Sequence, residues 1–215
     1  MLKKDSPSCG TQRVRVHGAR GRPKRTGVGL FAAALMERLP LLPVEEEGRL
    51  HDPRLRENYF TRVFAYRRLK AALRPRWTVG DLARFHAAER CLLMAHDPRA
   101  YRELGRMLEG GAVRPRAELA TRYPTVFLGA LRTPATRRKH VKVLRHMQDC
   151  FGERLDARAR TELTALIADY GRGLVPLMVP LTLIRRGVRR FEVASLTGQT
   201  YLEACPQELM LRNHT

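Results

Sequence analysis

The sequence predicts a mainly α-helical protein: a bundle of about six to eight helices preceded by a short basic remnant of an α/β domain. Three observations predict it. Apolar residues recur at helical spacing through most of the chain after residue 52, and capping residues mark the helix starts. No run shows the sustained alternation typical of strands, and no internal repeat is present. A chain of 215 residues with 44% hydrophobic and 7% aromatic residues is long enough for a substantial core.

Residues that typically start or end helices justify the expected helices in chain order. Asp52 caps the first long helix, and Thr78 with Asp81 is close to a capping box. Pro124 is expected to split one segment into two short helices, and Thr133 with Pro134 is expected to start the helix that follows. The expected helices are residues 53–73, 79–95, 98–108 (closed by Gly110 and Gly111), 116–122, 125–131, 136–151, 157–170 (capped by Asp156) and 174–190.

The first 42 residues differ in character from this series. They hold nine Lys or Arg against two acidic residues, with one clear apolar segment at residues 30–39, which is too little to fold alone. Residues 18–29, rich in glycine and basic residues, predict a loop that could hold an anion or be simply solvated. We therefore expect an N-terminal remnant at residues 1–42, a linker at residues 43–54 and a helical domain at residues 55–213.

The net charge indicates the class of partner. The chain has 41 Lys+Arg against 21 Asp+Glu, a formal charge of +20, which points to nucleic acid or an anionic membrane surface. The most apolar run, residues 174–184, contains two prolines and is shorter than the roughly 20 residues of a spanning helix. No secretory pattern follows the first lysines. We expect a cytoplasmic protein with no membrane partner.

The predicted helix at residues 136–151 has two faces of opposite chemistry. Helical spacing places His140, Leu144, Met147 and Phe151 on one stripe, and cations on the other. This basic face either binds a polyanion or is an ordinary solvated face. Together with a second basic cluster at the end of the last helix, it could form one cationic surface for phosphates if the two helices pack side by side. The candidate nucleic-acid-binding residues are Arg137, Arg138, Lys139, Lys142, Arg145, Arg185, Arg186, Arg189 and Arg190.

Other residue types give weaker signals. Trp77, Tyr101 and Tyr123 could stack on unpaired bases, although core positions are the preferred interpretation. The histidines His86, His96, His140 and His146 lack the spacing of a helical metal pair, so hydrogen-bonding roles are preferred. The four cysteines form no C-x-x-C pair, and no nucleotide-binding loop or nucleophile motif is present. Nothing in these patterns predicts an independent enzyme.

The motif SPSCG at residues 6–10 carries a family resemblance. With LKKD before it and TGVGLFAAALMERLPLLPVEEEGRLHDPRLREN after it, this stretch resembles the C-terminal end of the iron–sulfur thiouracil desulfidase family. The resemblance implies that Cys9 is one of three protein ligands of the cluster. The other two ligand cysteines belong to an N-terminal portion that this chain lacks, so it resembles a truncated or late-started version of a longer protein. Because a cluster needs several thiolates, we expect none in this chain alone.

Three further stretches resemble the YbgA-like domain of unknown function. They are FHAAERCLLMAHDPRAYRELG at residues 85–105, ATRRKHVKVLRHMQ at residues 135–148, and VPLTLIRR with QTYLEACPQELMLRN near the end. The resemblance covers roughly residues 55–213 and departs from the family pattern at Glu89 and Cys205. It implies that fused members remove sulfur from 4-thiouridine in transfer RNA, with the YbgA-like part helping to hold the RNA.

These patterns and resemblances lead to three hypotheses. The leading one is a helical domain that binds tRNA or another structured RNA, joined to the end of a desulfidase domain and not active as an enzyme by itself. The second is a fragment or subunit of an iron–sulfur desulfidase whose missing cluster ligands come from a partner. The third is a protein-interaction or DNA-associated bundle whose cationic face is incidental.

Overall fold

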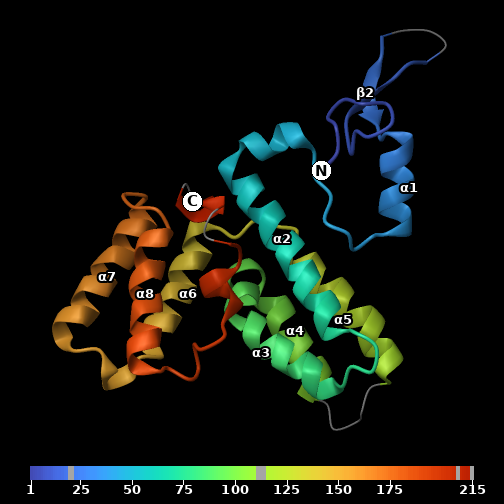
Figure 1. Ribbon diagram of the computed structural model, residues 1–215. Helices are drawn as coiled ribbons and strands as arrows, with labels where there is room; N and C mark the ends of the chain where they lie inside the picture. Colours follow the sequence, from blue (N-terminus) through green and yellow to red (C-terminus); the bar gives the residue numbers. More distant parts are fainter. Residues whose placement is uncertain (19–21, 110–114, 207–208, 214–215) are drawn as a thin grey trace.

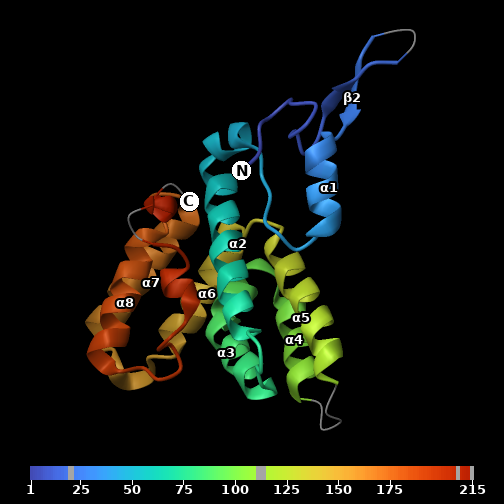
Figure 2. The ribbon, with the colours of Figure 1, turned by 45° about the vertical axis from the view of Figure 1, so that its right-hand side comes forward.

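The computed structural model describes residues 1–18, 22–109, 115–206 and 209–213. Within these residues the protein is mainly helical, as predicted, with one small sheet. A helical domain makes up most of it, and an N-terminal appendage, residues 1–42, projects from one end (Figures 1 and 2). The α-helices are α1 (Leu30–Arg38), α2 (Pro53–Ala72), α3 (Val79–His96), α4 (Pro98–Glu109), α5 (Arg116–Leu131), α6 (Arg137–Asp149), α7 (Ala157–Arg172) and α8 (Met178–Phe191).

The helical domain consists of two groups of helices that share one core. Helices α2, α3, α4 and α5 pack together, and α6, α7 and α8 form the second group, which joins the first through the contact of α6 with α3. Figure 1 shows the second group beside the first, with the C-terminal segment passing between them. That segment contains short 3₁₀ helices at Thr200–Glu203 and Leu211–Asn213, which contact α3 and α2. The C-terminal segment therefore packs where the two groups of helices meet.

Most of the predicted helix starts are confirmed. The Asp52 side chain accepts hydrogen bonds from the backbone of α2, and Thr78 and Asp81 form a complete capping box at α3. Asp156 caps α7, and Gly173 ends that helix in the left-handed conformation, with φ of 83°. Each of these signals depends only on neighbouring residues. The predicted end of α4 at Gly110 and Gly111 lies outside the described residues.

Two predictions about helix boundaries are wrong. Residues 116–131 form one continuous helix, α5, with Pro124 inside it. Leu119, Tyr123, Phe127 and Leu131, one turn apart, are all buried in the core, and this burial offsets the roughly 3 kcal/mol that an interior proline costs. Thr136, rather than Thr133, caps α6: its hydroxyl accepts a hydrogen bond from the Lys139 backbone N–H.

The appendage holds a strand pair that the loop prediction for residues 18–29 missed. Strands β1 (Val14–Val16) and β2 (Lys24–Gly27) form an antiparallel pair that is irregular between Val14 and Arg15. Each strand has only three or four residues, too few for a recognisable period of two.

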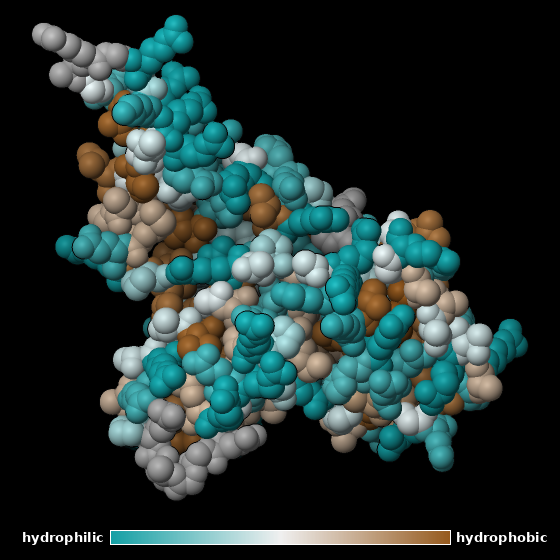
Figure 3. All heavy atoms as spheres, turned by 180° about the vertical axis from the view of Figure 1, so that it is seen from behind, coloured by the Kyte–Doolittle hydropathy of each residue, from teal (hydrophilic) through white to brown (hydrophobic). Residues whose placement is uncertain are grey.

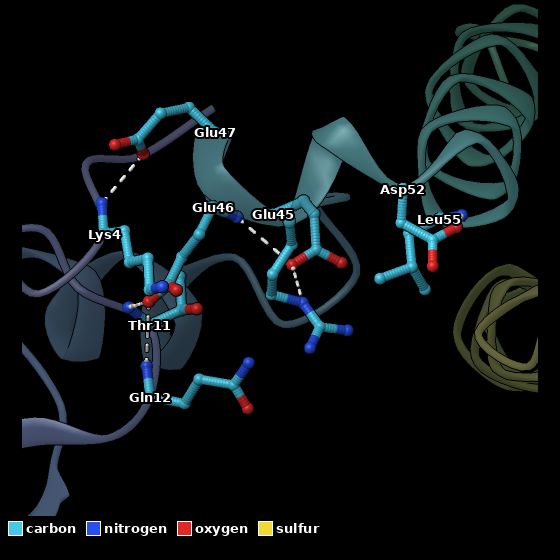
Figure 4. A network of polar contacts seen from close by, with 9 residues as sticks. Lys4, Thr11, Gln12, Glu45, Glu46, Glu47, Asp52 and Leu55 are labelled. Atoms are coloured by element: carbon cyan, nitrogen blue, oxygen red, sulfur yellow. Dashed lines mark hydrogen bonds and ion pairs between the residues drawn. The ribbon is translucent and has the colours of Figure 1, made fainter.

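Two neighbouring glutamates, Glu46 and Glu47, hold the appendage to the segment that leads into α2 (Figure 4). Glu46, only 2% exposed, accepts hydrogen bonds from the backbone N–H groups of Thr11 (2.8 Å) and Gln12 (3.3 Å). Glu47 accepts one from the Lys4 backbone N–H at 2.8 Å. Glu47 also begins a short 3₁₀ helix, Glu47–His51, that leads into α2. The segment expected to be a linker is therefore folded. Its glutamate carboxylates hold the appendage by accepting hydrogen bonds from backbone N–H groups.

The described helices do not include a membrane-spanning one: none is both long and apolar enough.

A pair of glycine substitutions tests the packing of α8 on the end of α6. A Cβ added at Gly187 would lie 2.7 and 2.9 Å from ring atoms of Phe151, which is only 1% exposed, whereas a Cβ at Gly129 in α5 meets nothing within 4 Å. We expect Gly187→Ala to lower the free energy of unfolding by about 1–3 kcal/mol. Gly129→Ala should raise it by about 0.5–1 kcal/mol. Urea denaturation of both variants measures this, and equal effects would contradict the packing described.

Candidate functional site

The outer face of α6 carries exposed cations that form no ion pair within the described part of the chain. Arg138, Lys142 and Arg145 are exposed, as the helical spacing predicted. Among the residues that the structure describes, none of the three forms a salt bridge, whereas Arg84 and Arg172 pair with carboxylates on their own helices. Unpaired cations in a row along one helix face are available to phosphate groups. We call these three residues the α6 outer face.

Two other candidate cations of α6 turn toward the protein. The Arg137 guanidinium lies 5.7 Å from the centre of the Tyr170 ring on α7. The Lys139 amine donates a hydrogen bond to the backbone carbonyl of His96. Both side chains are half-buried, so neither belongs to the α6 outer face.

The candidate cations of α8 also differ in their exposure to solvent. Arg186, Arg189 and Arg190 are exposed, with Arg189 3.5 Å from the Glu203 carboxylate and Arg190 over the Phe191 ring at 5.2 Å. Arg185 is half-buried, and its guanidinium contacts the sulfur of Met178. Helices α6 and α8 do pack against each other, which is the condition that a shared cationic surface requires.

The aromatic residues considered for base stacking occupy core positions. Trp77 is 7% exposed and lies under the Arg116 guanidinium, and Tyr123 is fully buried. Tyr101 stacks on the imidazole of His86, with ring centres 5.1 Å apart. The core interpretation is confirmed for Trp77 and Tyr123, which offer no open ring face to a base.

Glu89 is a buried acidic residue whose charge is balanced by an arginine. Glu89 is fully buried on α3, where its carboxylate accepts two hydrogen bonds from Arg68 on α2, at 2.6 and 3.1 Å. The Thr200 hydroxyl donates a third at 2.8 Å. This buried charge is thus paired and hydrogen-bonded, as burial requires.

Cys9 lies in a tight loop packed against the start of α1. The Cys9 backbone N–H donates to the Ser6 hydroxyl at 3.1 Å, and the backbone carbonyl of Ser8 accepts a hydrogen bond from Ala32. A Cβ at Gly29 would lie 2.3 Å from that carbonyl oxygen, so this close approach requires glycine. The thiol is half-exposed, and the loop presents it at the surface of the appendage.

The described residues of this chain do not fit an iron–sulfur cluster by themselves. Cys91 is buried on α3, and Cys150 follows the end of α6. Cys205, in the C-terminal segment, lies beside Thr61 of α2. Across the described ranges, no group of three or more His, Cys, Asp or Glu side chains is placed to hold a metal ion. Cys9 can supply one thiolate, and cluster binding needs others.

A cavity that the sequence did not predict, lined mainly by polar residues, lies where the two helix groups meet. Its volume is about 160 Å³. Exposed Arg54 and Thr136 lie at its rim, and the other polar side chains that line it are half-buried or buried. Apart from rim residues, the cavity is lined by Glu57, Asn58 and Thr61 of α2, His96 of α3, Arg137 and His140 of α6, and Tyr170 of α7.

The C-terminal segment supplies the groups that hold this cavity in shape. The Arg212 guanidinium donates to the Glu57 carboxylate at 3.0 Å and to the backbone carbonyl of Tyr201. The Tyr201 hydroxyl lies 2.6 Å from Nδ1 of His140. His96, His140, and Tyr201 with Arg212 come from the three separate stretches that carry the YbgA-like resemblance. Sequence spacing could not reveal this convergence, because packing alone brings α3, α6 and the chain end together.

Both cavity histidines are held neutral. Burial, and then the nearby Arg212, lowers the pKa of His140 well below its ordinary value. Burial likewise lowers the pKa of His96 to about 4, against the opposing effect of its hydrogen bond to the Thr133 carbonyl. Because a carbonyl oxygen can only accept, Nδ1 of His96 carries the proton at 2.9 Å from that oxygen. Nε2 of His96 therefore keeps its lone pair.

These histidines predict how stability depends on pH. The unfolded chain binds protons at its histidines below about pH 6.5, whereas burial keeps the folded His96 neutral down to a pKa of about 4. Their contribution to stability is present above pH 6.5 and is lost as the pH falls through this window, by up to about 1.4 kcal/mol per pH unit for each histidine.

The test is urea denaturation of a variant that lacks one of these groups. His96→Asn keeps a donor for the Thr133 carbonyl and removes the titration, so its free energy of unfolding should change less between about pH 7 and about pH 5 than that of the unmodified protein. His51→Asn, at an exposed histidine, is the control. Identical pH slopes for the unmodified protein and the His96→Asn variant would contradict the assignment.

Comparisons with known proteins find similar sequences for most of the helical domain. Residues 90–206 match the family described as "Protein of unknown function (DUF1722)". The "Uncharacterized protein YbgA" of Escherichia coli (strain K12) is 30% identical over 161 residues, which cover 74% of this chain and 95% of that protein. No solved structure gives a significant match. The chain belongs to the DUF1722 family of YbgA-like domains.

Proposed function

We propose that this protein binds structured RNA, transfer RNA in particular, through the α6 outer face. The observation that carries the proposal is a row of three exposed cations, without ion pairs to any described residue, on one helix of a chain with net charge +20. Arg138 and Arg145 are seven residues apart, so the row is about 10 Å long. Such a row contacts several phosphates, and the release of their counterions drives binding that weakens steeply with salt.

The exposed cations of α8 extend the proposed RNA surface. Arg186 and Arg190 form no ion pair among the described residues, and Arg189 has only the exposed contact with Glu203. Exposed ion pairs contribute little free energy, so Arg189 can exchange its carboxylate for a phosphate. The RNA contacts proposed here are to the backbone and position the RNA without reading its sequence.

The appendage supports a more specific proposal about the protein in which this domain works. We propose that it belongs to a desulfidase-type protein that removes sulfur from thiolated uridine in tRNA, with Cys9 as one iron–sulfur ligand. The tight loop that presents the Cys9 thiol supports this role. Since the described residues of this chain supply no set of ligands, the remaining ligand cysteines would come from a polypeptide portion outside it. On this proposal residues 1–42, 43–54 and 55–213 are the desulfidase remnant, the connecting segment and the RNA-binding domain.

One observation favours the related proposal that the appendage packs against that further portion or a partner subunit. Leu30 is 83% exposed and Phe31 is 52% exposed on α1, and Val16 and Val28 beside them are also exposed. Figure 3 shows hydrophobic surface over this projecting part of the molecule. Apolar surface of this kind is typical of an interaction site.

The RNA proposal is tested by removing the charges of the α6 outer face together. The triple variant Arg138→Gln, Lys142→Gln, Arg145→Gln should weaken tRNA binding, and it should reduce the slope of log affinity against log salt by about two to three. The matched control changes Arg99, Arg102 and Arg106 to Gln, three exposed arginines of α4. Filter binding at several salt concentrations, with duplex DNA of equal length as competitor, measures both variants.

Two results would contradict the proposal. If both triple variants lose affinity equally, overall charge rather than the α6 outer face determines binding. If duplex DNA competes as well as tRNA, the surface is not selective for structured RNA. A salt slope that changes only in the α6 variant, with weak competition by DNA, is the result that the proposal requires.

A further inference from the structure

We propose that the cavity between α2, α6 and α7 binds a phosphoryl group, either of a small phosphomonoester or at the end of a nucleic acid chain. This site is separate from the RNA surface proposed above, because its residues line the inner side of α6 rather than the α6 outer face. It therefore does not depend on the proposed function.

The size of the cavity suits a small polyatomic group. At about 160 Å³ it is close in volume to a cavity of roughly 150 Å³ that holds a benzene-sized molecule. Pockets for drug-sized ligands are larger, about 300–1,000 Å³. Arg54 and Thr136 are exposed at the rim, whereas His96, Thr61 and Tyr170 are buried. A group can thus enter from solvent and be enclosed by the protein.

The charges around the cavity favour an anion. Arg54 and Arg137 line it, and Arg212 lies behind the Glu57 carboxylate, to which it donates a hydrogen bond. Glu57 and Arg212 cancel each other, so the two other arginines give the cavity a net positive charge. The N-terminus of α6, a helix of 13 residues capped by Thr136, also faces this cavity. The dipole of this helix adds to the attraction for an anion.

Unsatisfied polar atoms point to a ligand independently of the helix terminus. Among the described residues, Nε of Arg137 is buried without a hydrogen-bond partner, as are Nε of Arg90 and Nε of Arg185, and such a state is costly for a charged donor. His96 and His140 are 5% and 6% exposed, and both line the cavity. Each uses Nδ1 for a protein partner, the Thr133 carbonyl or the Tyr201 hydroxyl. Within the described part of the chain, Nε2 of neither ring has a hydrogen-bond partner, so both remain available to phosphoryl oxygens or a phosphate hydroxyl.

Two other kinds of ligand fit less well. A nucleobase needs an open aromatic face, but the Tyr170 ring is 1% exposed, with the Arg137 guanidinium over it and the His140 ring against its edge. A metal ion would meet the arginine charges, and the described side chains provide no group of three ligands. A phosphoryl group fits because Arg and helix N-termini are its usual partners.

The first experiment titrates inorganic phosphate into the full chain at constant ionic strength and follows heat of binding and melting temperature. Arg137→Gln should weaken phosphate binding about tenfold or more, because it removes a charge-assisted contact. Arg138→Gln, the adjacent cation on the α6 outer face, should leave the affinity within about twofold. Arg54→Gln is the second test variant: it lies exposed at the rim and should weaken binding without disturbing the fold, which circular dichroism checks.

A second arm distinguishes the sources of the phosphoryl group. Adenosine monophosphate and a short RNA with a 5′-phosphate are compared with the same RNA ending in a 5′-hydroxyl. Preference for the phosphorylated RNA that Arg137→Gln abolishes assigns the cavity to a nucleic acid end, and binding of the mononucleotide alone assigns it to a small phosphomonoester. Either result supports a phosphoryl site.

The proposal is overturned if the unmodified protein does not bind phosphate. It is also overturned if folded Arg54→Gln and Arg137→Gln variants bind phosphate as tightly as the unmodified protein. The triple variant of the α6 outer face must retain phosphate binding even if it loses tRNA. Loss of both would show that one cationic surface serves both ligands and would overturn the separate site.

Discussion

The buried guanidinium of Arg212 joins the two helix groups of this protein. It is 9% exposed, donates to Glu57 on α2, and lies over the Tyr201 ring at 4.8 Å. The Tyr201 hydroxyl continues the chain of contacts to His140 on α6. A buried charge requires such partners, and removing one partner of a buried ion pair typically costs about 3–5 kcal/mol. Leu211 and Arg212, in the C-terminal segment, are therefore part of the core of the domain.

The same interaction determines the chemistry of the cavity. Arg212 balances the Glu57 carboxylate, and burial, followed by the charge of Arg212, lowers the pKa of His140. The histidines therefore face the cavity as neutral rings, and Arg54 and Arg137 form no ion pair with the residues that the structure describes. The structure thus separates two sets of cations on α6. Arg138 and the other two cations of the α6 outer face are exposed to solvent, whereas Arg137 lines the cavity.

Local signals in the sequence predicted the helices and the exposed face of α6 because they act between neighbouring residues. The Asp52 cap and the exposure of Arg138 follow from backbone geometry and helical period alone. Pro124 was misread because the burial of its helix outweighs a local penalty. The convergence of His96 and His140 could not be predicted: it depends on how α3 packs against α6, which no spacing along the chain encodes.

A double-mutant cycle between Glu57 and Arg212 tests most directly whether this buried pair joins the helix groups. The free energy of unfolding is measured by urea denaturation for Glu57→Gln, Arg212→Gln and the double variant. The account predicts that each single change is strongly destabilising, because it leaves the other charge buried without its partner. The double variant leaves no such charge, so the two changes should be coupled by at least about 1 kcal/mol. Additive effects of the two changes would contradict it, since the two side chains would then act independently.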